Sequence, residues 1–121
     1  MKVIIAGSRS LNPDGIADLL WGLISISLDN LKAEPPTEIV SGGARGADKF
    51  GEAYAKSNNI PVKQFLPDWN NNGKAAGFAR NQQMADYADA LIVLWDGKSR
   101  GTAHMMNCMK KLGKPVEVIY I

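Results

Sequence analysis

Apolar residues in this chain gather in short runs, and amphipathic stretches separate the runs. The first run, KVIIAG at residues 2–7, is continuous and rich in β-branched side chains, as in a strand that is buried on both faces. The run DALIVLWDG at residues 89–97 is the strongest of this kind, and PVKQFL at residues 61–66 is the weakest. Together with EIVSGG at residues 38–43 and PVEVIYI at residues 115–121, the pattern predicts five strands.

Helical patterns fill the segments between these runs. The first begins at Pro13, a residue favoured in a first helical turn, and carries apolar residues at i, i+3, i+4 and i+7 spacing. The expected helices cover residues 13–31, 46–58, 73–88 and 101–113. Alternation of strands and helices predicts an α/β fold: a small Rossmann-like three-layer sandwich with helices on both faces of a parallel five-stranded sheet, in the order 3-2-1-4-5. We expect residues 1–121 to form one domain.

Composition narrows the class of protein. The chain is 45% hydrophobic and 21% charged, which is ordinary for a globular protein. Cys108 is the only cysteine, so no internal disulfide can form, and this suits a reducing compartment. The apolar run at the N-terminus is too short for a leader or a membrane span, so we expect a cytoplasmic protein without a membrane partner. A net charge of +2 is too small, taken alone, to indicate a nucleic-acid surface.

Basic residues cluster in the loops that leave the first four predicted strands. These loops cover residues 7–10, 41–48, 66–81 and 95–104, and they contain Arg9, Arg45, Lys74, Arg80, Lys98 and Arg100. In a parallel sheet such loops meet at one edge, where ligands bind beyond the carboxyl ends of the strands. The clustering therefore predicts an anionic ligand at that edge.

Glycines in two of these loops favour a phosphate. Gly42, Gly43 and Gly46 allow a sharp turn and a close approach of backbone to ligand, and a helix that begins near Gly46 presents backbone N–H groups. The segment KSRGTAH at residues 98–104 repeats the arrangement, with hydroxyl groups added. Tight strand-to-helix turns alone would also explain the glycines, but two neighbouring loops with arginines favour phosphate-binding loops.

The predicted ligand-binding residues come from all four loops. They are Gly7, Ser8, Arg9, Ser41, Gly42, Gly43, Arg45, Gly46, Asp48, Asp68, Trp69, Lys74, Arg80, Asn81, Asp96, Ser99, Arg100, Gly101 and Thr102. Three of them keep a structural alternative: Asp48 could cap the second helix, Trp69 could cover the core, and Asp96 could cap rather than hold a sugar.

The sequence lacks the residue patterns of metal sites, nucleophilic triads and the common nucleotide-binding loops. Histidine, cysteine and carboxylates have no metal-ligand spacing, and no nucleophilic triad is available, so we expect no metal and no cofactor. The GxxxxGK[ST] loop of ATPases is absent, and so is GxGxxG after the first strand.

Four segments together resemble the SLOG superfamily, and more narrowly its YspA-like, YpsA-related branch. They are IIAGSRS at residues 4–10, SGGARGAD at 41–48, DWNNNGKAAGFARNQQMAD at 68–86 and WDGKSRGTAHMM at 95–106. The resemblance implies a Rossmann-like fold and a nucleotide-derived ligand. The superfamily also includes DNA-processing proteins, ligand-sensing domains and the Lonely Guy phosphoribohydrolases.

Similarity to those hydrolases is partial. Gly101 and Thr102 match their PGGxGTxxE loop, and Arg80 and Met84 match their RxxxM motif. The position of their catalytic glutamate falls on Met105, which cannot take part in acid–base chemistry. The catalytic residues are therefore unassigned, although an aspartate from another loop could replace the missing carboxylate.

Three functions compete. We favour a sensor or sequestering protein for a nucleotide, an ADP-ribose-like or a cyclic ligand, because arginines are abundant and the glutamate is missing. A nucleotide N-glycosidase is the alternative. DNA binding ranks last and a nucleic-acid partner is not expected, because no basic tail or aromatic strip appears. A homodimer or higher homo-oligomer is expected, through the helix over residues 13–31 or the methionine-rich helix over residues 101–113.

Overall fold

Five parallel strands form one sheet in the order β3-β2-β1-β4-β5, which confirms the predicted topology. The strands are β1 (Lys2–Gly7), β2 (Glu38–Ser41), β3 (Val62–Gln64), β4 (Ala90–Trp95) and β5 (Val116–Tyr120). The helices are α1 (Ala17–Asn30), α2 (Ala47–Ser57), α3 (Trp69–Asn72), α4 (Ala76–Tyr87) and α5 (Arg100–Lys111), with a 3₁₀ turn at Gly73–Ala75. This computed structural model describes the backbone of residues 1–121 and every side chain except those of Asn71, Asn72 and Lys74.

Two helices begin later than the sequence predicts. The first was expected from Pro13, but α1 starts at Ala17 because Gly15 has φ +80° and the N–H of Ile16 closes a turn onto the carbonyl of Pro13 at 2.9 Å. The third was expected from Gly73, but φ at that glycine is +53° and α4 starts at Ala76. Both corrections have the same cause, since a positive φ cannot continue a right-handed helix.

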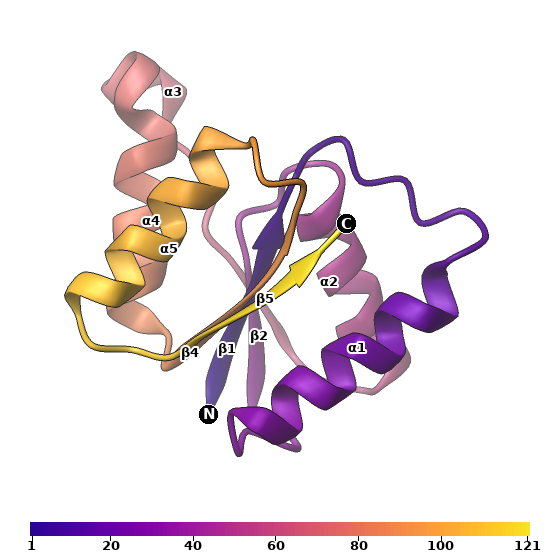
Figure 1. Cartoon of the computed structure of the whole chain (residues 1–121). Coiled ribbons are helices and arrows are strands. Elements are labelled where there is room, and N and C mark those ends of the chain that lie inside the picture. Colours follow the sequence, from indigo (N-terminus) through magenta and orange to yellow (C-terminus); the bar gives the residue numbers. More distant parts are fainter.

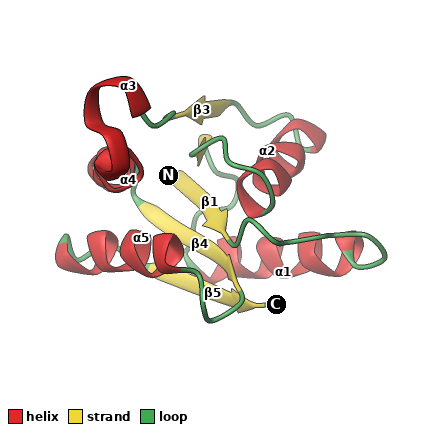
Figure 2. Ribbon diagram, turned by 90° about the horizontal axis from the view of Figure 1, so that it is seen from above, coloured by secondary structure: helices red, strands yellow, loops and turns green.

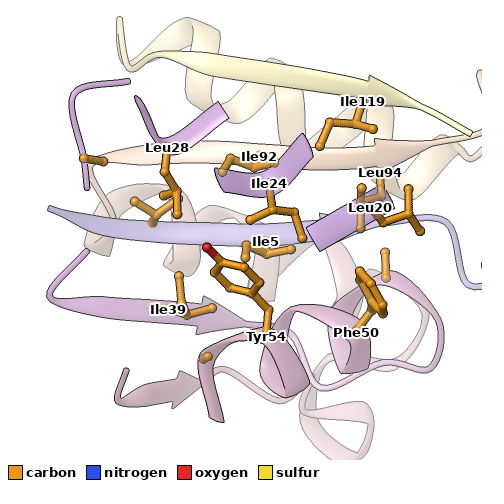
Figure 3. Close-up of a cluster of buried hydrophobic side chains, with 14 of the residues drawn as sticks. Ile5, Leu20, Ile24, Leu28, Ile39, Phe50, Tyr54, Ile92, Leu94 and Ile119 are labelled. Atoms are coloured by element: carbon orange, nitrogen blue, oxygen red, sulfur yellow. The ribbon is translucent and has the colours of Figure 1, made fainter. Parts of the chain in front are cut away.

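The sheet is buried on both faces, as its continuous apolar strands predict. Figure 2 shows α1 and α2 on one face and α4 and α5 on the other. On the first face, Ile5 of β1 and Ile92 of β4 pack with Ile24 of α1, and none of them is exposed (Figure 3). On the second face, Met84 of α4 and Met105 of α5 pack against β1 and β4.

The methionines of α5 belong to the core. Met105, Met106 and Met109 are all buried in the cluster on the second face, together with Cys108. The structure therefore assigns this row of α5 to packing, which removes it as a candidate contact surface between copies. None of the helices over the described residues 1–121 is long and apolar enough to cross a membrane.

The loops with the predicted chemistry meet at one edge of the sheet. Because all strands run in the same direction, the loops after β1, β2 and β4 leave from the same edge, at the top of Figure 1. The short helix α3, where the sequence predicts only a loop, lies at this edge as well. The fold thus brings together segments that are far apart in the sequence.

Candidate functional site

Two connected hollows occupy the C-terminal edge of the sheet. The inner hollow is a cavity of about 70 Å³ and the outer one is an open groove of about 560 Å³. Arg9, Ala44 and Arg80 line both hollows, so the two form one continuous site. The inner cavity is also lined by Gly7, Asp48, Asn81, Ser99, Gly101, Thr102 and Met105, and the outer groove by Gly42, Gly43, Arg45, Leu66, Pro67 and Trp69.

Arg80 forms the floor between the hollows. Only 9% of it is exposed, although arginine is rarely buried without partners. Its Nη1 donates a hydrogen bond to the carbonyl of Gly42 at 2.6 Å, and its Nε donates to Oδ1 of Asn81 at 3.0 Å. Burial lowers the pKa of Arg80, and the nearby carboxyl of Asp48 partly offsets this. Arg80 therefore joins α4 to the loop after β2 and is already engaged before any ligand binds.

Asp48 stabilises the glycine-rich loop after β2 through a hydrogen bond to its backbone. Its Oδ2 accepts a hydrogen bond from the backbone N–H of Ala44 at 3.1 Å, and none of the described side chains caps α2. This decides against the capping alternative for Asp48. Burial raises the pKa of Asp48 to about 6, although the hydrogen bond from Ala44 and the charge of Arg80 both act to lower it.

Two glycines permit this close arrangement. A Cβ on Gly42 would lie 2.4 Å from Nη1 of Arg80 and 2.8 Å from Oδ2 of Asp48, so only glycine leaves room for both side chains. Gly46 has φ +77°, and a Cβ there would lie 2.5 Å from the carbonyl oxygen of Ser8. The same carbonyl accepts the N–H of Ala47 at 3.1 Å, so the first N–H of α2 is used within the protein rather than offered to a phosphate.

The loop after β4 is held by its own polar side chains. Oδ1 of Asp96 accepts the N–H groups of Lys98 at 2.8 Å and Ser99 at 2.9 Å, and these bonds lower the pKa of Asp96. Ser99 caps α5, where its Oγ accepts the backbone N–H of Thr102 at 3.4 Å and the hydroxyl of Thr102 at 3.0 Å. Oγ of Ser8 accepts the N–H of Asp96 at 3.0 Å and ties this loop to β1. Asp96 therefore holds the turn that precedes α5, and Ser99 rather than Asp96 caps the helix.

Exposed cationic and aromatic side chains form the rim. Arg9 and Arg45 are exposed in loops at this edge, and Arg100 is exposed at the first residue of α5. Trp69, at the start of α3, is 54% exposed and lines the outer groove with Arg9 and Arg45, so its indole does not cover the core. Leu66 is exposed beside it.

Some predicted residues stand outside the two hollows. Oγ of Ser41 donates to Oε2 of Glu52 at 2.6 Å and accepts the N–H of Gly43 at 3.0 Å, so Ser41 supports the loop from behind. Asp68 and Arg100 are exposed at the same edge without lining either hollow. The side chain of Lys74 lies outside the described residues.

The predicted set omits several residues that line the two hollows or lie beside them. Ala44 and Leu66 line the groove, and an apolar residue placed directly before a proline and a polar loop was the available signal for Leu66. Phe78 of α4 is exposed and stacks on His104 of α5, with ring centroids 4.3 Å apart, near the inner cavity's Asn81. No group of three potential metal ligands occurs among the residues that the structure describes.

Comparison with known proteins identifies the family. Residues 1–71 match the model of the family described as YspA, cpYpsA-related SLOG. The chain belongs to this family. Gene 61 protein of Mycobacterium phage D29 is 33% identical to this SLOG chain, and the match covers 95% of this chain and 93% of that protein. The resemblance to the Lonely Guy hydrolases stays a prediction.

Two solved structures share the fold of this SLOG chain. DNA processing protein A from Streptococcus pneumoniae superposes with a TM-score of 0.72 at 22% identity, covering 97% of this chain and 49% of that one. DNA processing protein A from Helicobacter pylori, described for its single-stranded DNA binding mode, superposes with a TM-score of 0.70 at 23% identity, covering 98% and 64%. This chain thus spans between about half and under two thirds of these relatives.

These relatives correct two predictions. A sensor or sequestering protein for a nucleotide-derived ligand was ranked first and a nucleic-acid partner was not expected; both are wrong, because the structural relatives are DNA-processing proteins. The physical reason is that net charge and the missing basic tail carried too much weight. The structure gathers exposed arginines and an exposed indole in one groove, which a weak total charge conceals.

Proposed function

We propose that this chain binds single-stranded DNA along the C-terminal edge of its sheet. One observation carries the proposal: Arg9, Arg45 and the exposed indole of Trp69 line the same open groove. A cationic path for phosphates next to an aromatic platform for bases is the usual arrangement for binding single strands. The relation to DNA processing protein A supports the same partner.

The side chains divide into a contacting group and a supporting group. Arg9, Arg45 and Arg100 are exposed and reach phosphates, which position a strand without reading its sequence. Trp69 stacks on an unpaired base, and a base within a duplex has no free face to offer. Arg80 and Asp48 hold the loop that presents these contacts, because Nη1 of Arg80 bonds the carbonyl of Gly42 and Oδ2 of Asp48 bonds the N–H of Ala44.

Loss of one rim arginine should weaken binding and reduce its dependence on salt. For Arg45→Ala we expect an affinity for fluorescent oligothymidylate about five- to twentyfold lower, whatever the base sequence, and a log–log salt slope smaller by about 1. Fluorescence anisotropy between about 50 and 200 mM salt measures both quantities. Lys110→Ala is the control, because Lys110 is also exposed but lies in the last turn of α5, at the other end from the groove. Equal losses in the two variants, or none in Arg45→Ala, would remove the groove from the proposal.

Loss of the indole should leave a different signature. We expect Trp69→Ala to lower affinity by about five- to a hundredfold through lost stacking, with the salt slope unchanged, and Trp69→Phe to restore most of it. Leu112→Ala alters an exposed apolar residue at the end of α5 that lies away from the groove, and it serves as the control. If duplex DNA bound as tightly as the single strand, and Trp69→Ala had no effect on either, stacking would play no part.

A further inference from the structure

Strand β5 leaves an open row of backbone hydrogen-bonding groups at one edge of the sheet. The carbonyl of Pro115 accepts from Leu91, and the N–H of Ile121 donates to the carbonyl of Trp95, both at 3.0 Å. Odd-numbered residues of the segment therefore direct their backbone groups to β4. The even-numbered residues of β5, among them Val118, direct theirs away from the sheet.

This edge has one charged residue, Glu117, and none of the lysines or prolines that usually protect an edge strand. Natural edges are short, or carry lysine or proline, because an open edge invites pairing with another chain. The opposite edge follows this rule, since β3 has only three residues and includes Lys63. Strand β5 has five residues, VEVIY, with no basic residue and no proline. The side chains of Val118 and Tyr120 are exposed, the latter by 73%.

Helix α1 adds an apolar stripe beside the same edge. Leu19, Leu23 and Ile26 recur at spacings of four and three residues, so they share one flank of the helix. Leu19 is 63% exposed and Ile26 is 56% exposed. Asn30 continues the stripe, and its Nδ2 donates to Oε1 of Glu117 in β5 at 2.8 Å. The stripe and the strand edge are therefore neighbours, as Figure 2 shows for α1 and β5.

We propose that this edge binds a second copy of the chain, with the two β5 strands antiparallel about a twofold axis at Val118. An identical strand is the partner that this edge fits, because a twofold axis at Val118 pairs residue 116 with 120 and 118 with its own equivalent. Glu117 then stands opposite Ile119, so no like charges face each other across the strands. The stripe on α1 carries no charged side chain and meets the partner on the same side of the sheet.

The proposed pairing leaves both grooves open. In an antiparallel arrangement the C-terminal edges of the two sheets point in opposite directions. The groove residues lie in the segments that follow β1, β2 and β3, including α3 and α4, rather than on β5. Self-association and DNA binding therefore use different surfaces. A test of the dimer does not depend on whether the chain binds DNA.

Sedimentation velocity over micromolar to submillimolar concentrations tests the pairing. The wild type should sediment at the mass of two chains, against 13.1 kDa for one. Val118→Pro removes an outward N–H that the ladder to β4 does not use, and proline is tolerated at such edge positions. We expect this variant to be folded by circular dichroism and monomeric.

A second variant tests the same pairing in case Val118→Pro does not fold. Leu19→Glu places a charge in the α1 stripe at an exposed position, and we expect it to raise the dimer dissociation constant at least tenfold. Leu66→Glu places the same charge on an exposed leucine in the groove and should leave the dimer intact. A monomeric wild type, or dimers that survive both Leu19→Glu and a folded Val118→Pro, would overturn the proposal.

Discussion

Asp48→Asn should abolish a pH dependence of stability that the wild-type protein shows. Between about pH 4 and pH 6 we expect the buried Asp48 carboxyl to lower the wild-type free energy of unfolding by about 3 kcal/mol. Burial raises the pKa of this carboxyl from 3.8 to about 6, so the folded protein keeps a proton that the unfolded chain has already released. The stabilising contribution is complete below about pH 4 and is lost as the pH rises through the folded pKa. Asparagine has no proton to release in this range, so the variant lacks this pH-dependent contribution to stability.

Urea unfolding across this pH range measures the effect. We expect the free energies of unfolding of wild type and Asp48→Asn to diverge as the pH rises from about 4 to about 6, with the variant gaining, and to run parallel above that. Asp14→Asn changes an exposed carboxyl and should follow the wild type. The comparison isolates Asp48, because other carboxyls titrate in both proteins. Parallel profiles for wild type and Asp48→Asn would mean that the folded carboxyl ionises normally.

Gly46→Ala should destabilise the fold by about 3–5 kcal/mol. The glycine has φ +77° and ψ −125°, a conformation that residues with a side chain rarely adopt. An added Cβ would also lie 2.5 and 2.6 Å from the backbone oxygens of Ser8 and Arg9. Backbone atoms cannot swing aside as a flexible side chain can. The loops after β1 and β2 would have to separate, and they are the two loops that carry Arg9 and Arg45.

Gly77→Ala provides the matched comparison. Gly77 lies in α4, and a Cβ there would meet nothing within 4 Å. Replacing a helical glycine with alanine stabilises by about 0.5–1 kcal/mol. Chemical unfolding should therefore move the two midpoints in opposite directions. If both variants matched the wild type, the close approach of the two loops at Gly46 would be wrong.

The fold could be predicted because the burial of each strand shows in the apolar pattern of consecutive residues. Runs such as residues 2–7 reveal strands that are covered on both faces, and the alternation with helices leaves few topologies to consider. The late starts of α1 and α4 depend on the φ angles of Gly15 and Gly73, which a helical pattern does not record.

The site was predictable only in part. Arginines in four successive strand-end loops indicated the right edge, because parallel strands end together. The sequence did not predict which of the arginines is buried. Arg80 is covered because the carbonyl of Gly42, which is distant in the sequence, lies 2.6 Å from its Nη1. Whether Trp69 faces solvent or core also depends on tertiary placement. The ranking of ligands failed at this level, since rim and floor arginines look alike in a sequence.

The single direction of all the strands has a practical consequence for optical probes. Residue 1 and residue 121 lie at opposite edges of the sheet, as N and C mark in Figure 1. A strand of about six residues is about 20 Å long, so a dye attached before Met1 stands roughly that far from the groove. A dye after Ile121 instead stands at the groove edge, beside the exposed ring of Tyr120. Energy transfer to a labelled oligonucleotide would therefore be stronger from the second position, while the first leaves both surfaces free of the dye.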